Sequence, residues 1–293
     1  MSPATALFLA LLPFLVPAQT QQRLAAGAPQ PFQDRRIRES SGVIASRKHP
    51  GLLWTMNDSG GDPMLFLTDT AGASLGAFTV SAATNVDWET LGRGRCGEAE
   101  CLFIGDTGDN SERRRSVTLY RIPEPAPQSP PRDAVVDGAG AVRVEYPDGP
   151  HDVEALYVEP DGSVVLVTKG RSRGILTFRV PARAWTTGGS ARAERLDSLP
   201  IAANLAMGRA VTDAAISPDG RKVVVRTYRE LWFFTRENDG HLTLDPARPV
   251  CDVTGLQRQG EAVDWWDGDR LVLTSERGSA RDGTILLVQC PVL

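Results

Sequence analysis

The sequence predicts an all-β protein, a β-propeller with five blades, and three observations support this fold class. Five short segments with a common pattern recur at intervals of about 48 to 65 residues along the 293-residue chain. Each is followed by two apolar runs rich in β-branched and aromatic residues and bounded by turn residues. No long stretch shows a helical apolar stripe. Repeats of this kind are typical of propellers, so we expect four-stranded antiparallel blades, with six blades as the alternative.

The repeated segments align on one residue in each expected blade, which we call the anchor. The anchors are Ser41, Glu89, Glu154, Asp213 and Glu261. The runs predicted to form second strands are 52–55, 102–104, 164–167, 223–225 and 271–274, and those predicted to form third strands are 64–67, 117–120, 175–178, 231–234 and 285–288. Turns such as Pro160-Asp161-Gly162 join first and second strands, because Pro presets φ and Gly tolerates a positive φ.

The beginning of the chain has a different composition from the repeats. Residues 1–18 contain an apolar core and end in the small-residue pattern Val16-Pro17-Ala18, which predicts a secretory signal peptide, with an uncleaved membrane anchor as the alternative. Residues 19–31 are rich in Gln, Ala and Pro and predict a flexible leader. Residues 32–293 predict a single propeller domain, in which 32–38 would add the outer strand of the last blade. We therefore expect a secreted, extracytoplasmic protein with no membrane span after signal cleavage.

Four cysteines agree with an oxidising compartment. Cys96 and Cys101 flank a tight loop in the second blade and are expected to form one disulfide. Cys251 and Cys290 would then form a second, which ties the fourth blade to the last strand. A zinc site is disfavoured because the spacing is not that of a C-x₂-C motif.

The formal net charge of −4 and the absence of a basic stripe argue against a nucleic-acid partner. We expect a monomer that binds a small molecule or a protein at the rim of the propeller.

Acidic residues cluster at the ends of the repeats that would face one mouth of the central channel. Carboxylates brought close together repel one another unless a cation lies among them, and oxygen ligands favour Ca²⁺. The candidate metal ligands are Asp58, Asp87, Glu89, Asp106, Asp109, Asp152, Glu154, Asp213 and Glu261. The alternative is that these acids accept hydrogen bonds from backbone N–H groups and fasten one blade to the next.

The same rim carries residues that a ligand would contact. The candidate ligand-binding residues are Lys169, Arg171, Arg226, Glu276 and Arg277. Arginine offers bidentate contacts to phosphate or carboxylate, so a rim with both charges would hold a metal-bridged anion. The alternative is that these are solvated charged loops. Trp88 lies between two rim acids and is a further residue of interest.

Several short motifs in residues 37–170 occur in a recognisable combination. They are Ser41-Gly42-Val43, Leu53-Trp54-Thr55, Asn57-Asp58-Ser59-Gly60, Asp87-Trp88-Glu89, Gly105-Asp106-Thr107-Gly108-Asp109-Asn110, Tyr146-Pro147-Asp148-Gly149 and Asp152-Val153-Glu154-Ala155-Leu156. In this combination the chain resembles a group of secreted bacterial β-propeller proteins, mostly without an assigned activity, and more loosely it is similar to phytase-like and SdiA-regulated propellers.

This resemblance implies calcium near the acidic D-x-E positions, here Asp87 with Glu89 and Asp152 with Glu154. In the phytase-like group a calcium-bridged phosphate is attacked by metal-activated water. The chain departs from that pattern in its last two blades, where Val211 and Gln259 replace the first acid.

Two functions follow from these features. The first is an extracytoplasmic propeller that binds Ca²⁺ at an acidic rim and holds a ligand or partner there. The alternative is a calcium-dependent phosphoric-ester hydrolase of the phytase-like kind. The sequence leaves open whether the protein is an enzyme. Gly72-Ala73-Ser74-Leu75-Gly76 matches a nucleophile-elbow pattern, but it lies in an expected hairpin and not at a strand-to-helix turn.

Overall fold

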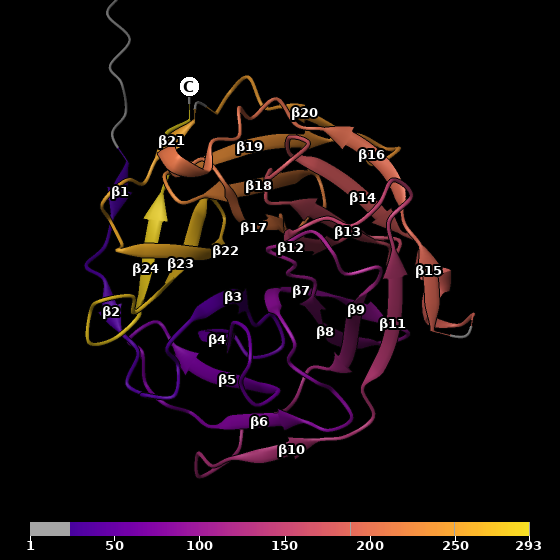
Figure 1. Ribbon diagram of the computed structural model, residues 1–293. Coiled ribbons are helices and arrows are strands. Elements are labelled where there is room, and N and C mark those ends of the chain that lie inside the picture. Colours follow the sequence, from indigo (N-terminus) through magenta and orange to yellow (C-terminus); the bar gives the residue numbers. More distant parts are fainter. Residues whose placement is uncertain (1–23, 188, 249, 293) are drawn as a thin grey trace, which may run out of the picture.

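Five sheets, antiparallel in their inner strands, surround a central axis in the computed structural model, which describes residues 24–187, 189–248 and 250–292 (Figure 1). The predicted signal peptide, 1–18, and the first part of the predicted leader lie outside the described residues. The prediction of a five-bladed β-propeller is confirmed. Each blade starts at the axis with its first strand and proceeds outward.

The strands of the blades follow the order predicted from the repeats. The first strands are β3 (Ser40–Ala45), β7 (Trp88–Cys96), β12 (Val153–Val158), β17 (Val211–Ile216) and β22 (Gln259–Asp267). The second strands are β4 (Leu52–Asn57), β8 (Ala99–Asp106), β13 (Val164–Thr168), β18 (Lys222–Thr227) and β23 (Arg270–Glu276). The third strands are β5 (Met64–Asp69), β9 (Val117–Pro123), β14 (Leu176–Val180), β19 (Glu230–Arg236) and β24 (Thr284–Gln289).

The outer strands are less regular than the inner three. The fourth strands of blades one to four are β6 (Ala77–Val80), β11 (Gly140–Glu145), β16 (Glu194–Ser198) and β20 (Leu242–Leu244). Blades one and two each gain a parallel fifth strand from the following blade, namely β10 (Ala134–Val136) on β6 and β15 (Ser190–Arg192) on β11. The short β21 (Cys251–Asp252) also pairs with β19. The 3-10 helices are η1 (Ala182–Trp185) and η2 (Leu205–Met207).

The last blade is completed by residues close to the N-terminus. Strands β1 (Ala25–Ala26) and β2 (Gln30–Pro31) pair antiparallel with β24, at the left of Figure 1. The closing strand therefore lies in 25–31, and the assignment to 32–38 was wrong, as was a flexible leader extending to residue 31. An edge strand needs only backbone pairing, so Ala and Gln suffice there and leave no apolar signal in the sequence.

The hydrophobic core lies between the blades, because each sheet packs one face against its neighbour. Trp54 of blade one and Trp88 of blade two belong to one such cluster and are fully buried. The Trp88 indole N–H donates to the carbonyl of Thr84 at 2.9 Å, so this ring fills a blade interface and does not face a ligand. Corresponding clusters join the other neighbouring blades, including the last and the first.

Both predicted disulfides are present. Cys96–Cys101 joins β7 to β8 within blade two, and Cys251–Cys290 joins β21 to the residue after β24. The second bridge fastens blade four to blade five next to the point where the N-terminal strands close the ring. None of the helices in the described part of the chain has the length and hydropathy needed to cross a bilayer.

Candidate functional site

Every first strand is irregular at the same position. The pairing of each first strand with its second strand shifts by one residue near its start. The extra residues are Ser41, Glu89, Glu154 and Thr212, with Glu261 in the shifted stretch of the last blade. A bulge of this kind re-aims a side chain. The anchors are therefore confirmed in four blades, and in blade four the equivalent residue is Thr212.

Asp213 lies one residue beyond the anchor and serves a different purpose. Its carboxyl accepts hydrogen bonds from Thr90 Oγ1 at 2.8 Å and from the N–H of Val263 at 2.9 Å, so it links blade four to blades two and five. It is fully buried, and burial raises the pKa of Asp213 well above its usual value. Its prediction as a metal ligand is corrected, because Asp213 fastens blades together inside the ring.

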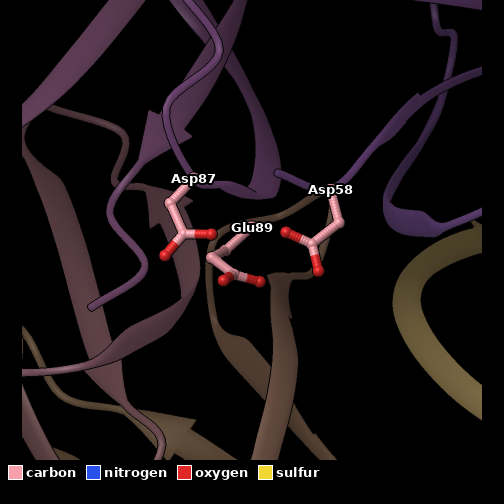
Figure 2. Close-up of side chains that lie close together, drawn as sticks. All are labelled: Asp58, Asp87 and Glu89. Atoms are coloured by element: carbon pink, nitrogen blue, oxygen red, sulfur yellow. The ribbon is translucent and has the colours of Figure 1, made fainter. Parts of the chain in front are cut away.

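Three carboxylates meet at one mouth of the channel. Asp58 follows β4, Asp87 precedes β7 and Glu89 is the anchor of β7. One oxygen of each lies within 4.8 Å of an oxygen of the others. Figure 2 shows the three side chains directed toward a common point. Blades one and two thus bring together three of the nine predicted metal ligands.

Glu89 is the most unusual member of this cluster. Its side chain is 5% exposed, and among the described residues no group donates a hydrogen bond to its carboxylate. Burial raises the pKa of Glu89 well above its usual value, and repulsion from Glu154, Asp58 and Asp87 adds to this effect. Burial and then the charge of Asp58 likewise raise the pKa of Asp87 to about 6. Lys169 and Arg114 offset only part of this repulsion, because they form their ion pairs with other acids, Glu154 and Asp106.

The backbone behind the cluster has no room for a side chain. A Cβ atom at Gly108 would lie 2.3 Å from Glu89 Oε1 and 2.5 Å from Asp87 Oδ2. The residue follows β8, in a loop whose N–H groups at Thr107 and Gly108 donate to the carbonyl of Asp87. Glycine at this position therefore lets the loop pack directly against two of the three carboxylates.

Asn85 positions the cluster, and sequence analysis missed it as a site residue. Its side-chain N–H donates to the carbonyl of Asp58 at 2.7 Å, and its Oδ1 accepts from the N–H of Trp88 at 3.1 Å. The amide thereby connects the exit of blade one to the start of β7. A polar residue just ahead of an acidic pair was the only signal in the sequence.

Three other predicted metal ligands already have internal partners. Asp106 is paired with Arg114 at 2.9 Å and accepts from the N–H of Asp87 at 3.2 Å. Asp109 accepts from the N–H of Arg114 at 2.6 Å, within its own loop. Asp152 accepts from the N–H of Asp109 at 2.9 Å and from Arg171 Nε at 2.9 Å. Asp106, Asp109 and Asp152 therefore act as hydrogen-bond acceptors that hold loops and blades together, which was the alternative to metal binding.

Lys169 supplies a positive charge within the mouth. Its Nζ lies 2.6 Å from Glu154 Oε1, and its side chain is 12% exposed. Burial is the largest influence and opposes the charged form, but the neighbouring groups, Glu154 first, together outweigh it, so the pKa of Lys169 is raised and the ammonium stays charged. Lys169 also offsets part of the repulsion felt by Glu89 and Glu261. Glu154 thus has an internal cation as its partner, unlike Glu89, although burial still raises the pKa of Glu154 to about 8.

Glu261 and Glu276 of the last blade form a carboxyl pair. Each carboxyl influences the pKa of the other, and Gln259 Nε2 donates to Glu261 Oε1 at 3.4 Å. Burial and then nearby acids, Asp58 first, raise the pKa of Glu276 to about 7. We call the end of the channel that holds Asp58, Asp87, Glu89, Glu154, Glu261 and Glu276 the acidic mouth.

The remaining predicted ligand-binding residues divide by location. Arg171 is paired with Asp152 but is partly exposed, and Arg277 is exposed in the loop after β23. Arg226 is only 1% exposed, and its guanidinium donates to the carbonyls of Ala262 at 2.5 Å and Thr274 at 3.0 Å. Arg226 therefore lies between blades four and five, and its prediction as a ligand contact is corrected.

The acidic mouth does not continue through the molecule. Below the anchors, side chains from all five blades leave a cavity of only about 10 Å³ on the axis, lined among others by Ile44, Leu91, Leu156, Ala215 and Asp264. This is the size of a single water molecule. The acidic mouth is therefore not joined to the other end of the molecule by a wide channel along the axis.

Comparison with known proteins supports the fold and leaves the chemistry open. No profile of a known protein family and no curated protein matches the sequence. The PQQ-bound aldose sugar dehydrogenase from Streptomyces coelicolor is similar in structure, with a TM-score of 0.50 and 10% identity over 92% of this chain and 99% of that one. The Dos1 propeller gives a TM-score of 0.38 with 11% identity over 85% of this chain and 58% of that one. The finer resemblance to phytase-like and SdiA-regulated propellers stays a prediction.

Proposed function

We propose that this protein is an extracytoplasmic binding propeller that holds one divalent cation, Ca²⁺, between Asp58, Asp87 and Glu89, and retains an anionic ligand or partner through it. The carboxylate of Glu89 carries this proposal. It is buried, it receives no hydrogen bond from the described residues, and it is directed at two other carboxylates. A buried carboxylate in this position is neutralised either by a proton, as its raised pKa indicates, or by a bound cation.

The donor set supports a hard cation. The three residues offer only oxygen, and Ca²⁺ takes six to eight oxygen ligands from carboxylates, carbonyls and water. Three carboxylates leave positions for an anionic ligand. When bound, the ion would supply positive charge among these carboxylates. Asn85 and Gly108 would hold the ligating side chains in place before the ion arrives.

The extracytoplasmic location is supported by the two disulfides, which persist in oxidising compartments. Each disulfide joins two strands or the end of a strand: β7 to β8, and β21 to the residue after β24. All four cysteines of the chain are in these disulfides, so no thiol is left to bind a metal.

The second candidate function is a calcium-dependent phosphoric-ester hydrolase, and one observation favours it. The ammonium of Lys169 and the partly exposed guanidinium of Arg171 lie in blade three beside the carboxylates of the acidic mouth. Such cations would neutralise a phosphate bound next to the metal. Their ion pairs with Glu154 and Asp152 weaken this support, because each charge is already partly compensated.

Calorimetric titration of the mature protein with Ca²⁺, with and without inorganic phosphate, tests the proposal. We expect one site, at least tenfold weaker binding in Glu89→Gln, and unchanged binding in Glu194→Gln, whose carboxylate is exposed on blade three. No Ca²⁺ binding, or equal effects of the two variants, would contradict the proposal. Calcium-dependent turnover of a generic phosphomonoester, lost in Glu89→Gln, would favour the hydrolase.

A further inference from the structure

A second cavity lies at the opposite end of the channel from the acidic mouth. Its volume is about 310 Å³, and it lies among the turns that join first and second strands in blades one to four. We call it the arginine cavity because Arg47, Arg93 and Arg95 all line it. The volume is at the lower end of the range for small-molecule sites.

Most charged groups around the arginine cavity are already paired. Arg93 lies 2.5 Å from Asp264 and also donates to the carbonyl of Ala45 at 3.1 Å. Glu159 is paired with Arg236 at 2.6 Å and with Arg179 at 2.5 Å. The carboxylate of the remaining aspartate, Asp219, accepts hydrogen bonds within its own turn.

Among the charged residues that line the cavity, the guanidinium groups of Arg47 and Arg95 and the carboxylate of Glu100 remain. Among the described residues, neither Arg47 nor Arg95 forms an ion pair. Arg47 extends from blade one to the carbonyl of Pro218 in blade four, at 3.3 Å, and Arg95 donates to the carbonyl of Glu98 at 3.1 Å. Arg47 is an exposed residue, but the protein around its guanidinium, and then the charge of Arg93, lower its pKa. A bound anion would relieve this crowding of positive charge.

The cavity also offers apolar surface. Val158, Pro160, Ile216 and Pro218 contribute to its lining beside the arginines. A few charged groups on a partly apolar wall are typical of sites that orient a small organic molecule by one polar end. Guanidinium groups match carboxylate and phosphate oxygens with two hydrogen bonds each.

We propose that the arginine cavity binds a small organic anion, with its carboxylate or phosphate held by Arg47 and Arg95 and its body against Val158, Ile216 and Pro218. This site is separate from the acidic mouth, because the axis between them leaves only about 10 Å³. The proposal does not depend on cation binding, so either can fail while the other stands.

The test uses the whole mature protein, with inorganic phosphate and benzoate as probes in separate calorimetric titrations with EDTA present. We expect saturable binding of at least one probe, weakened at least tenfold in the Arg47→Gln and Arg95→Gln double variant. Arg35→Gln is the matched control, because this arginine is exposed and lies outside the cavity. Circular dichroism checks that all variants are folded.

The binding pattern also identifies the anionic group. Binding of phosphate alone assigns a phosphate site, and binding of benzoate alone assigns a carboxylate site with an apolar wall. Absence of saturable binding of both probes, or binding that the double variant and the control alter equally, would overturn the proposal.

Discussion

The side chain of Asn85 bridges blades one and two at the acidic mouth, donating to the carbonyl of Asp58 at 2.7 Å. Its oxygen accepts from the N–H of Trp88, between Asp87 and Glu89. One amide therefore sets the separation between a carboxylate of blade one and two of blade two.

Replacing Asn85 by Ala should loosen the cation site. Both hydrogen bonds are lost, and a largely buried carbonyl and N–H lose their partner, which costs about 1–3 kcal/mol. We expect Ca²⁺ affinity to fall about tenfold and the melting temperature to drop, measured by calorimetric titration and thermal denaturation. An unchanged affinity would show that Asn85 does not position the carboxylates.

Replacing Gly108 by Ala should disrupt the site without a general change in backbone conformation. The new Cβ would meet the carboxylates of Glu89 and Asp87 at 2.3 and 2.5 Å, so one or both must move. We expect at least a tenfold loss of Ca²⁺ affinity by titration. Gly61→Ala is the matched control, because a Cβ there meets nothing within 4 Å. Equal effects of the two substitutions would contradict this account.

The stability of the metal-free protein should depend on pH in a defined direction. The pKa of Asp87 is raised to about 6 from 3.8, so between these values the folded protein holds a proton that the unfolded chain has lost. In EDTA we therefore expect the melting temperature to fall as pH rises from about 4 to 6. The raised pKa of Glu89 extends the fall further upward.

Calcium should reverse this dependence, because it binds the ionised carboxylates and its affinity grows as they lose their protons. Thermal denaturation across pH with EDTA or with excess Ca²⁺ measures both effects. Asp87→Asn should flatten the profile in EDTA. A melting temperature that rises with pH in EDTA over this window would contradict the assignment.

Replacing Lys169 by Met should separate cation affinity from stability. The ammonium is 2.6 Å from Glu154 and repels any cation in the same mouth, so its removal should tighten Ca²⁺ binding by about tenfold. The protein in EDTA should be less stable, because Glu154 is left buried without its partner. Titration and thermal denaturation test the two effects. Lys222→Met is the control, since this lysine is more exposed and lies 3.6 Å from Asp245 in blade four.

Replacing Asp213 by Ala should affect stability alone. The substitution removes the acceptor for Thr90 and Val263, and we expect the free energy of unfolding to fall by about 2–4 kcal/mol in denaturant titration. Ca²⁺ affinity should stay within twofold, because Asp213 is not part of the carboxylate cluster. Asp213→Asn keeps one acceptor and should cost less. A large loss of Ca²⁺ affinity in Asp213→Ala would show that Asp213 does contribute to the cation site.

The blades were predictable from sequence because their inner three strands carry repeated apolar runs, which packing between sheets requires. The anchors of four blades were predictable for the same reason. In blade four the acidic residue stands one position after the bulge, so alignment by residue type selected Asp213 when the geometry selects Thr212. A one-residue step along a strand reverses the direction of the side chain.

The rest of the site depended on information that no local pattern contains. Arg226 and Lys169 both fall near the end of a second strand, yet Arg226 pairs with Asp213 in the sheet and points between blades, whereas Lys169 lies one residue beyond β13. Asn85 acts through a carbonyl 27 positions earlier in the chain. Such contacts arise from the closing of the ring.

Ala25 and Ala26 pair with Gln289 and Val288, so the ring can close only after almost all of the chain has been synthesised. The first four blades can form in order as the chain is synthesised. The strand that pairs with β1 and β2 is β24, which is the last strand to be made. If the protein is exported as proposed, the Cys251–Cys290 bridge can form outside the cytoplasm and fasten blade four to blade five beside this seam.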